Sequence, residues 1–168
     1  MYSRFTLEIL NETGSEQTLR AFFFIIMKII FDYNRTIFDP EKQELYPGVF
    51  DLINELVISH ELFLVSKDEP GRKDVLSSLG IDKHFKKIVF TKDKSVSLFQ
   101  QIVDDAKNVL VVGDRVQGEI SVGNQLNYET VWVRQGIFGN QEPESEIQIP
   151  NHVINNIAEL ARVIKLYE

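Results

Sequence analysis

The sequence contains no cysteine among its 168 residues. Disulfide bonds, thiolate nucleophiles and thiolate metal sites are therefore excluded. The three histidines, His60, His84 and His152, lie far apart and lack the spacing of a zinc site. A chain without cysteine agrees with a reducing compartment, and we expect a cytoplasmic location.

The sequence also lacks an excess of basic residues and a long hydrophobic run. Its formal net charge is −7, so we expect no bulk binding to nucleic acid. The most apolar stretch, residues 21–31, is too short to span a bilayer and contains Lys28, so we expect no membrane association. No small-residue cleavage site follows it, which argues against a signal peptide.

Hydrophobic residues make up 43% of the chain and charged residues 26%, a balance typical of a globular domain. The first 26 residues differ from the rest, because a polar, turn-like segment at 11–17 precedes the regular pattern. We predict an N-terminal extension at 1–26 and one domain at 27–168. One hypothesis makes Met27 the true start. The alternative is a real N-terminal element that packs on the domain.

Short apolar runs alternate with helical patterns from residue 27 onward. The runs end in polar residues and indicate buried parallel strands at 29–33, 62–66, 87–90, 109–112 and 130–133. Apolar residues at helical spacing predict helices at 49–57, 75–79, 96–105, 120–126 and 154–166. This alternation predicts a Rossmann-like α/β domain with a parallel sheet and helices on both faces.

Four polar residues lie at strand ends or helix starts of this scheme. Asp32 ends the first strand, Ser66 ends the second, Asp114 follows the fourth, and Lys94 begins the third helix. The carboxyl ends of parallel strands meet at one edge of an open sheet, where ligands bind. Carboxylates there can hold Mg²⁺ or attack phosphorus, and a hydroxyl and an ammonium can hold phosphoryl oxygens.

The order of these residues resembles the haloacid dehalogenase-like (HAD) superfamily. Residues 32–36, Asp-Tyr-Asn-Arg-Thr, resemble the first motif, DxDxT, and Ser66 resembles the second. Lys94 is similar to the third motif, with Lys92 as the other candidate, and residues 113–119 resemble the fourth. The resemblance runs from about residue 27 to residue 133. It implies a HAD-like core without a large cap domain.

The resemblance also implies roles for single residues. Asp32 would be the nucleophile that forms an aspartyl-phosphate. Mg²⁺ would be held by Asp32, the main-chain carbonyl of Asn34, Asp114 and Glu119. Ser66 and Lys94 would bind the phosphoryl group, and residues 35–45 would form a mobile turn over the site. Arg35 stands where the family usually has glycine, and it is either a phosphate-binding residue or a solvated loop residue. The substrate would be a phosphorylated small molecule or macromolecule.

Asn34 departs from the family pattern, which has a second aspartate at this position. An asparagine cannot carry the proton of a general acid or base, a role that contributes about 10²–10⁴-fold to rate. Two function hypotheses follow. The first is a Mg²⁺-dependent phosphohydrolase that lacks this acid, and the second is a catalytically impaired protein that binds a phosphorylated ligand or a partner.

Other interpretations are weaker. A receiver domain would need an acidic pair after the first strand, which is missing, and a dinucleotide-binding domain would need a GxGxxG loop. The candidate residues also have plainer alternatives: Ser66 as a turn hydroxyl, Lys94 as a surface lysine, Glu119 as a favourable charge in a first helical turn. Two interpretations are open for the basic cluster of Lys67, Arg72 and Lys73: it contacts an anionic substrate, or it belongs to a solvated loop and helix start.

Overall fold

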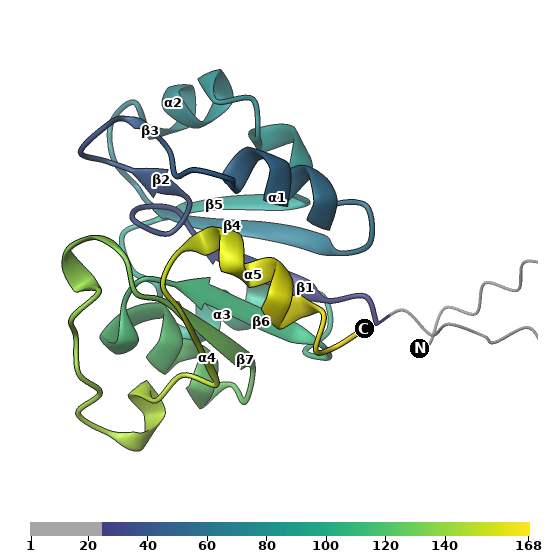
Figure 1. The fold of residues 1–168 in the computed structure, drawn as a ribbon, viewed down its shortest axis with the longest axis vertical. Helices are drawn as coiled ribbons and strands as arrows, with labels where there is room; N and C mark the ends of the chain where they lie inside the picture. The colour runs from purple at the N-terminus through teal and green to yellow at the C-terminus, as the bar shows by residue number, and fades with distance from the viewer. Residues whose placement is uncertain (1–24) are drawn as a thin grey trace, which may run out of the picture.

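A six-stranded parallel sheet forms the centre of the molecule (Figure 1). The computed structural model describes residues 25–168. The predicted extension at 1–26 therefore lies almost wholly outside the described residues, and it stays a prediction. The sheet order is β5-β4-β1-β6-β7-β8, so the first strand in sequence lies inside the sheet.

The strands match the five predicted apolar runs within one or two residues. They are β1 Lys28–Asp32, β4 Glu61–Lys67, β5 Lys87–Thr91, β6 Val109–Gly113, β7 Glu129–Val133 and, in addition, β8 His152–Ile154. Every neighbouring pair in the sheet is parallel. The predicted Rossmann-like fold class is confirmed.

Helices cover both faces of the sheet. They are α1 Val49–Leu56, α2 Arg72–Ser78, α3 Val96–Ile102, α4 Ser121–Gln125 and α5 Leu160–Ile164. Helices α1, α2 and α5 contribute to one hydrophobic cluster, and α3 packs in a second cluster on the other face. Figure 1 shows α1 and α5 in front of the strands.

The side chains of β1 divide between these two clusters. Ile29 and Phe31 belong to the larger cluster and Ile30 to the smaller one, because successive side chains of a strand point to opposite faces. All three are fully buried. Burying each such side chain contributes roughly 1.5–3 kcal/mol, so β1 is anchored from both sides. Rigid anchoring fixes the position of Asp32 at its end.

The structure corrects one sequence prediction and adds detail to another. The C-terminal helix does not begin at Ile154, because residues 152–154 pair with β7 as the edge strand β8 and the helical turns start at Ile157. The segment predicted as a mobile turn contains a small antiparallel hairpin, β2 Phe38–Asp39 and β3 Glu44–Leu45. Apart from this hairpin, the described chain holds no inserted domain between β1 and α1.

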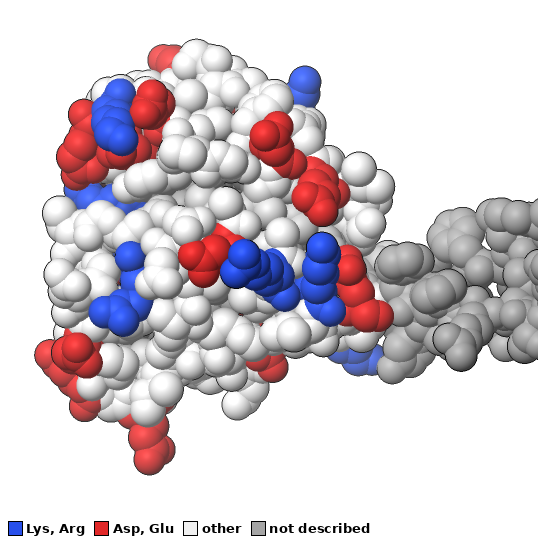
Figure 2. Space-filling view, in the orientation of Figure 1, with Lys and Arg blue, Asp and Glu red and all other residues white. Residues whose placement is uncertain are grey.

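Charged side chains are mixed over the face drawn in Figure 2. Lysines and arginines occur there in small groups beside acidic side chains. Residues 25–168 contain no helix that is long and apolar enough to cross a membrane.

Candidate active site

Asp32 lies at the carboxyl end of β1 and is 4% exposed. The chain turns sharply after it, since the main-chain N–H groups of Ile37 and Phe38 both donate to the carbonyl of Tyr33. This turn brings Thr36 back to the strand end, where its hydroxyl donates to Asp32 Oδ2 at 3.1 Å. The second oxygen of Asp32 faces the site.

Lys94 binds that second oxygen. Its Nζ donates to Asp32 Oδ1 and, at 2.6 Å, to Glu119 Oε1, so one ammonium joins two buried carboxylates. The Lys94 side chain is 22% exposed, whereas Lys92 is an exposed residue at the cavity rim. Of the two lysines left open by the sequence, the structure places Lys94 beside Asp32.

Asp114 and Glu119 come from the turn after β6. The main-chain carbonyl of Asp114 accepts a 3.0 Å hydrogen bond from Trp132 Nε1, which fixes the turn against β7. Glu119 folds back over Gly113, and a Cβ at Gly113 would lie only 2.8 Å from Glu119 Cβ. The glycine is therefore required for the close approach of Glu119.

Burial perturbs the charges of this cluster. Burial raises the pKa of Asp32 to about 6, although Lys94 acts in the opposite direction. Burial, followed by the charges of Asp32 and Glu119, raises the pKa of Asp114 to about 8. Burial opposes the charge of Lys94, but the two carboxylates outweigh it and raise the pKa of Lys94. Such perturbed groups in one cleft are typical of functional sites.

The donor set fits Mg²⁺ in part. Asp114 Oδ2 and Glu119 Oε2 are buried without a hydrogen-bond partner among the described residues, and a cation would satisfy them. Within residues 25–168, however, no three acidic or histidine side chains are arranged as a metal cluster. A Mg²⁺ ion would thus rely on Asp32, Asp114 and the carbonyl of Asn34, with one Glu119 oxygen already held by Lys94.

The contacts of Ser66 and Arg35 connect them less directly to Asp32 than those of Lys94 do. Ser66 is 1% exposed at the end of β4, and its hydroxyl donates to the carbonyl of Lys67 at 3.2 Å rather than into the cavity. Arg35 lines the cavity, pairs with Glu41 at 3.3 Å and lies 5.7 Å from the centre of the Phe138 ring. Their predicted phosphate-binding roles stay predictions.

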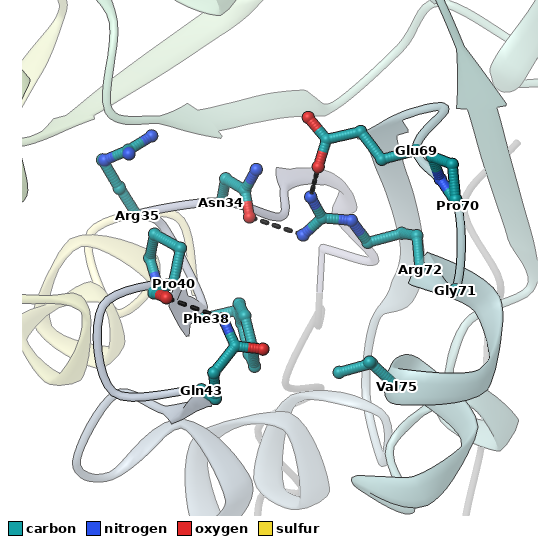
Figure 3. A pocket seen from close by; sticks show the side chains of 10 residues that line it. All are labelled: Asn34, Arg35, Phe38, Pro40, Gln43, Glu69, Pro70, Gly71, Arg72 and Val75. Atoms are coloured by element: carbon teal, nitrogen blue, oxygen red, sulfur yellow. Dashed lines mark hydrogen bonds and ion pairs between the residues drawn. The ribbon is translucent and has the colours of Figure 1, made fainter.

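Asn34 is held by an arginine from the start of α2 (Figure 3). Arg72 Nη1 donates to Asn34 Oδ1 at 2.6 Å, and Arg72 Nη2 pairs with Glu69. The Arg72 guanidinium also lies 4.8 Å from the centre of the Tyr33 ring. Three partners therefore fix the guanidinium, which in turn fixes the Asn34 amide.

Two adjoining cavities meet at Asn34. One, of about 470 Å³, contains Asp32, Lys94, Asp114 and Glu119. The other, of about 390 Å³, lies between the β2–β3 hairpin and α2, and Figure 3 shows its lining. Asn34 lines both, so it stands between the buried acids and the space beside α2.

No sequence pattern indicates the pairing of Arg72 with Asn34. The two residues are 38 positions apart, and the composition of the basic cluster around Arg72 favours a solvated loop and helix start. Thr36 was visible within the DxDxT-like segment, yet its hydrogen bond to Asp32 depends on the turn after β1.

Comparisons with known proteins agree with the observed fold. A family model described as HAD-hydrolase-like matches residues 95–160. The fold is similar to that of an uncharacterized protein from Listeria monocytogenes serotype 4b, with a TM-score of 0.70, 15% identity, and coverage of 84% of this chain and 98% of that chain. The chain has a HAD-like fold.

Two further solved structures share the HAD-like fold. One is D,D-heptose 1,7-bisphosphate phosphatase from Burkholderia thailandensis, with a TM-score of 0.64, 15% identity, and coverage of 83% of this chain and 98% of that chain. The other is the putative HAD-hydrolase YfnB from Bacillus subtilis bound to magnesium, with a TM-score of 0.61 and 22% identity. This second match covers 73% of the present chain and 57% of the YfnB chain. No curated protein matches the sequence.

Proposed function

We propose that this HAD-like protein is a Mg²⁺-dependent phosphohydrolase that acts through an aspartyl-phosphate on Asp32. The observation that carries the proposal is the buried Asp32 carboxylate, held by Thr36 and Lys94 at the end of an interior strand. One oxygen is fixed by the hydroxyl, and the other faces the cavity with Asp114 and Glu119. A positioned carboxylate of this kind can act as a nucleophile.

The other residues would support the same step. Lys94 balances the charge of Asp32 and Glu119, so that a phosphate dianion can approach the carboxylate. Bound Mg²⁺ would supply charge neutralisation to the phosphoryl oxygens. Arg35 and Lys92, at the cavity wall, would attract the anionic substrate.

The substrate would be a phosphorylated molecule whose size the open cavity does not restrict. The cavity that holds the acids, about 470 Å³ in volume, is bordered by the β1 turn, the β5–α3 loop and residue 138. No cap covers it in the part of the chain that is described. A phosphorylated small molecule and a phosphorylated macromolecule are both compatible with this opening, and a cytoplasmic location remains our expectation.

A second candidate function rests on Asn34. Its amide is fixed by Arg72 and carries no transferable proton, which favours a catalytically impaired protein that binds a phosphorylated ligand or a partner. In that case Mg²⁺ and phosphate would bind without turnover.

Hydrolysis of p-nitrophenyl phosphate by the full chain separates the two functions. We expect product release that requires Mg²⁺ and is lost in Asp32→Asn, which keeps the shape of the side chain but not its charge. Asp93→Asn, an exposed carboxylate at the rim of the same cavity, is the matched control. Phosphate and Mg²⁺ binding without any product would support the second function and contradict the first.

A further inference from the structure

The contacts of Asn34 constrain which phosphorylated compounds this site can use. Arginine carries only donors, so the oxygen of the Asn34 amide must be the atom that faces Arg72. Figure 3 shows this oxygen joined to the guanidinium, which leaves the amide nitrogen as the atom that Asn34 can offer to another group. Position 34 offers the reacting group an N–H donor that can form a hydrogen bond but cannot give up a proton.

Within the described residues, Asp114 and Glu119 each have an unpaired buried oxygen in the cavity that Asn34 lines, but in the proposed function both would hold Mg²⁺. Glu69 lines both cavities with Asn34, but its carboxylate pairs with Arg72. Lys94 holds Asp32 and one oxygen of Glu119. The Arg72 guanidinium is itself only 10% exposed and packs on Tyr33, so this arrangement is built into the fold.

The need for a proton depends on the leaving group. An alkoxide that departs from phosphorus is strongly basic and requires a general acid, whereas a carboxylate or a phosphate departs as a stable anion. A fixed N–H donor is sufficient to stabilise such an anion as it forms. The Asn34 amide thus suits anhydrides of phosphoric acid and does not suit alkyl phosphate esters.

We propose that this protein takes its phosphoryl group from phosphoric anhydrides, acyl phosphates above all, and keeps it on Asp32 as a long-lived phosphoenzyme. This inference rests on the proposed role of Asp32 as nucleophile. An Asp32 oxygen forms a bond to phosphorus, the bond from phosphorus to the carboxylate oxygen breaks, and its electron pair leaves with the carboxylate. No proton is needed in this step.

The second half of the cycle needs a base. Water must attack the phosphorus of the aspartyl-phosphate, and one of its protons must be accepted while the Asp32 carboxylate leaves as an anion. Asn34 cannot accept that proton, and Glu69 is held in its ion pair with Arg72. Asp114 and Glu119 would be engaged by Mg²⁺ in the proposed function. Phosphoryl transfer to Asp32 is therefore faster than its hydrolysis, and the phosphoenzyme accumulates.

Intact-protein mass spectrometry after acid quenching tests this inference on the full chain with Mg²⁺. Three donors are compared: acetyl phosphate, pyrophosphate and glycerol 3-phosphate. We expect acetyl phosphate to add the mass of one phosphoryl group within minutes and glycerol 3-phosphate to add none. Labelling by pyrophosphate would identify anhydrides in general as donors, and its absence would restrict them to acyl phosphates.

Variants define the role of position 34. Asp32→Asn should abolish the label. Asn34→Asp restores a proton-carrying group and should speed the loss of the label by about 10²–10⁴-fold. Asp74→Asn, an exposed residue of α2 close to Arg72 in sequence, is the control and should leave both rates unchanged.

Two results would overturn the inference and are distinguishable. Rapid hydrolysis of glycerol 3-phosphate without an accumulating label would contradict it while the phosphohydrolase function remained. No label from any donor, together with no hydrolysis of p-nitrophenyl phosphate, would reject the phosphohydrolase function as well.

Discussion

Replacing Lys94 by methionine should destabilise this protein strongly. The lysine ammonium is the shared partner of Asp32 and Glu119, whose side chains are each 4% exposed. Methionine keeps most of the side-chain length and removes the charge, so two buried carboxylates face each other without a cation. Breaking a buried pair by removing one partner costs about 3–5 kcal/mol.

That loss is a large part of the stability of an ordinary domain, which is about 5–15 kcal/mol. Urea denaturation of the wild type and of Lys94→Met measures it as a difference in the free energy of unfolding. Protonation of the buried carboxylates limits the loss, so the difference should be larger at about pH 8 than at about pH 5.5. The folded variant then binds more protons than the unfolded chain, and its stability falls as pH rises.

Two comparisons make the result specific. Lys92→Met removes an exposed lysine from the same loop and should change the free energy of unfolding by less than about 0.5 kcal/mol. Adding Glu119→Gln to Lys94→Met removes one buried charge and should recover about 0.5–3 kcal/mol of the loss. A loss below about 1 kcal/mol in Lys94→Met, within the range of an exposed ion pair, would refute the buried bridge.

Three further predictions concern other parts of the molecule. Gly113→Ala should cost about 1–3 kcal/mol in urea denaturation, because the added methyl group meets Glu119; an unchanged midpoint would contradict the close approach. Mg²⁺ at about 100 times its Kd should stabilise the wild type by about 2.7 kcal/mol in thermal unfolding and should not stabilise Asp114→Asn; equal stabilisation of both would exclude Asp114 as a ligand. Burial lowers the pKa of His60, whose Nδ1 accepts from the Met27 N–H at 3.3 Å, so stability should be full above about pH 6.5 and fall below it. Urea midpoints of wild type and His60→Gln across this range measure that slope, and an equal slope in both would contradict the assignment.

The sheet could be predicted from the sequence because its strands are buried on both faces. Such strands appear as continuous apolar runs, and the runs at 29–33, 62–66 and 109–112 lie within one residue of β1, β4 and β6. The edge strand β8 was missed because its three residues, one of them an exposed valine, merge with the apolar pattern of the following helix. A short edge strand is defined by its pairing with β7, which no local pattern records.

The acidic residues of the candidate site could be predicted from the sequence, but the contacts that hold the site together could not. Asp32 and Asp114 follow strand ends, so the parallel sheet alone brings them to one edge. The Lys94 bridge was one of two options, because the loop after β5 contains two lysines, Lys92 and Lys94, and only the folded loop places one of them beside Asp32. The pairing of Arg72 with Asn34 depends on the packing of α2 beside the β1 turn, which sequence spacing does not encode.

The central claim is that Asp32 is the nucleophile that accepts the phosphoryl group. Its most direct test is to incubate the full chain with Mg²⁺ and acetyl phosphate, quench in acid, digest, and locate the phosphoryl group by fragment masses. The account predicts a single modified residue, Asp32, and no label when Mg²⁺ is removed. A label on another residue, or an equal label in Asp32→Asn, would contradict it.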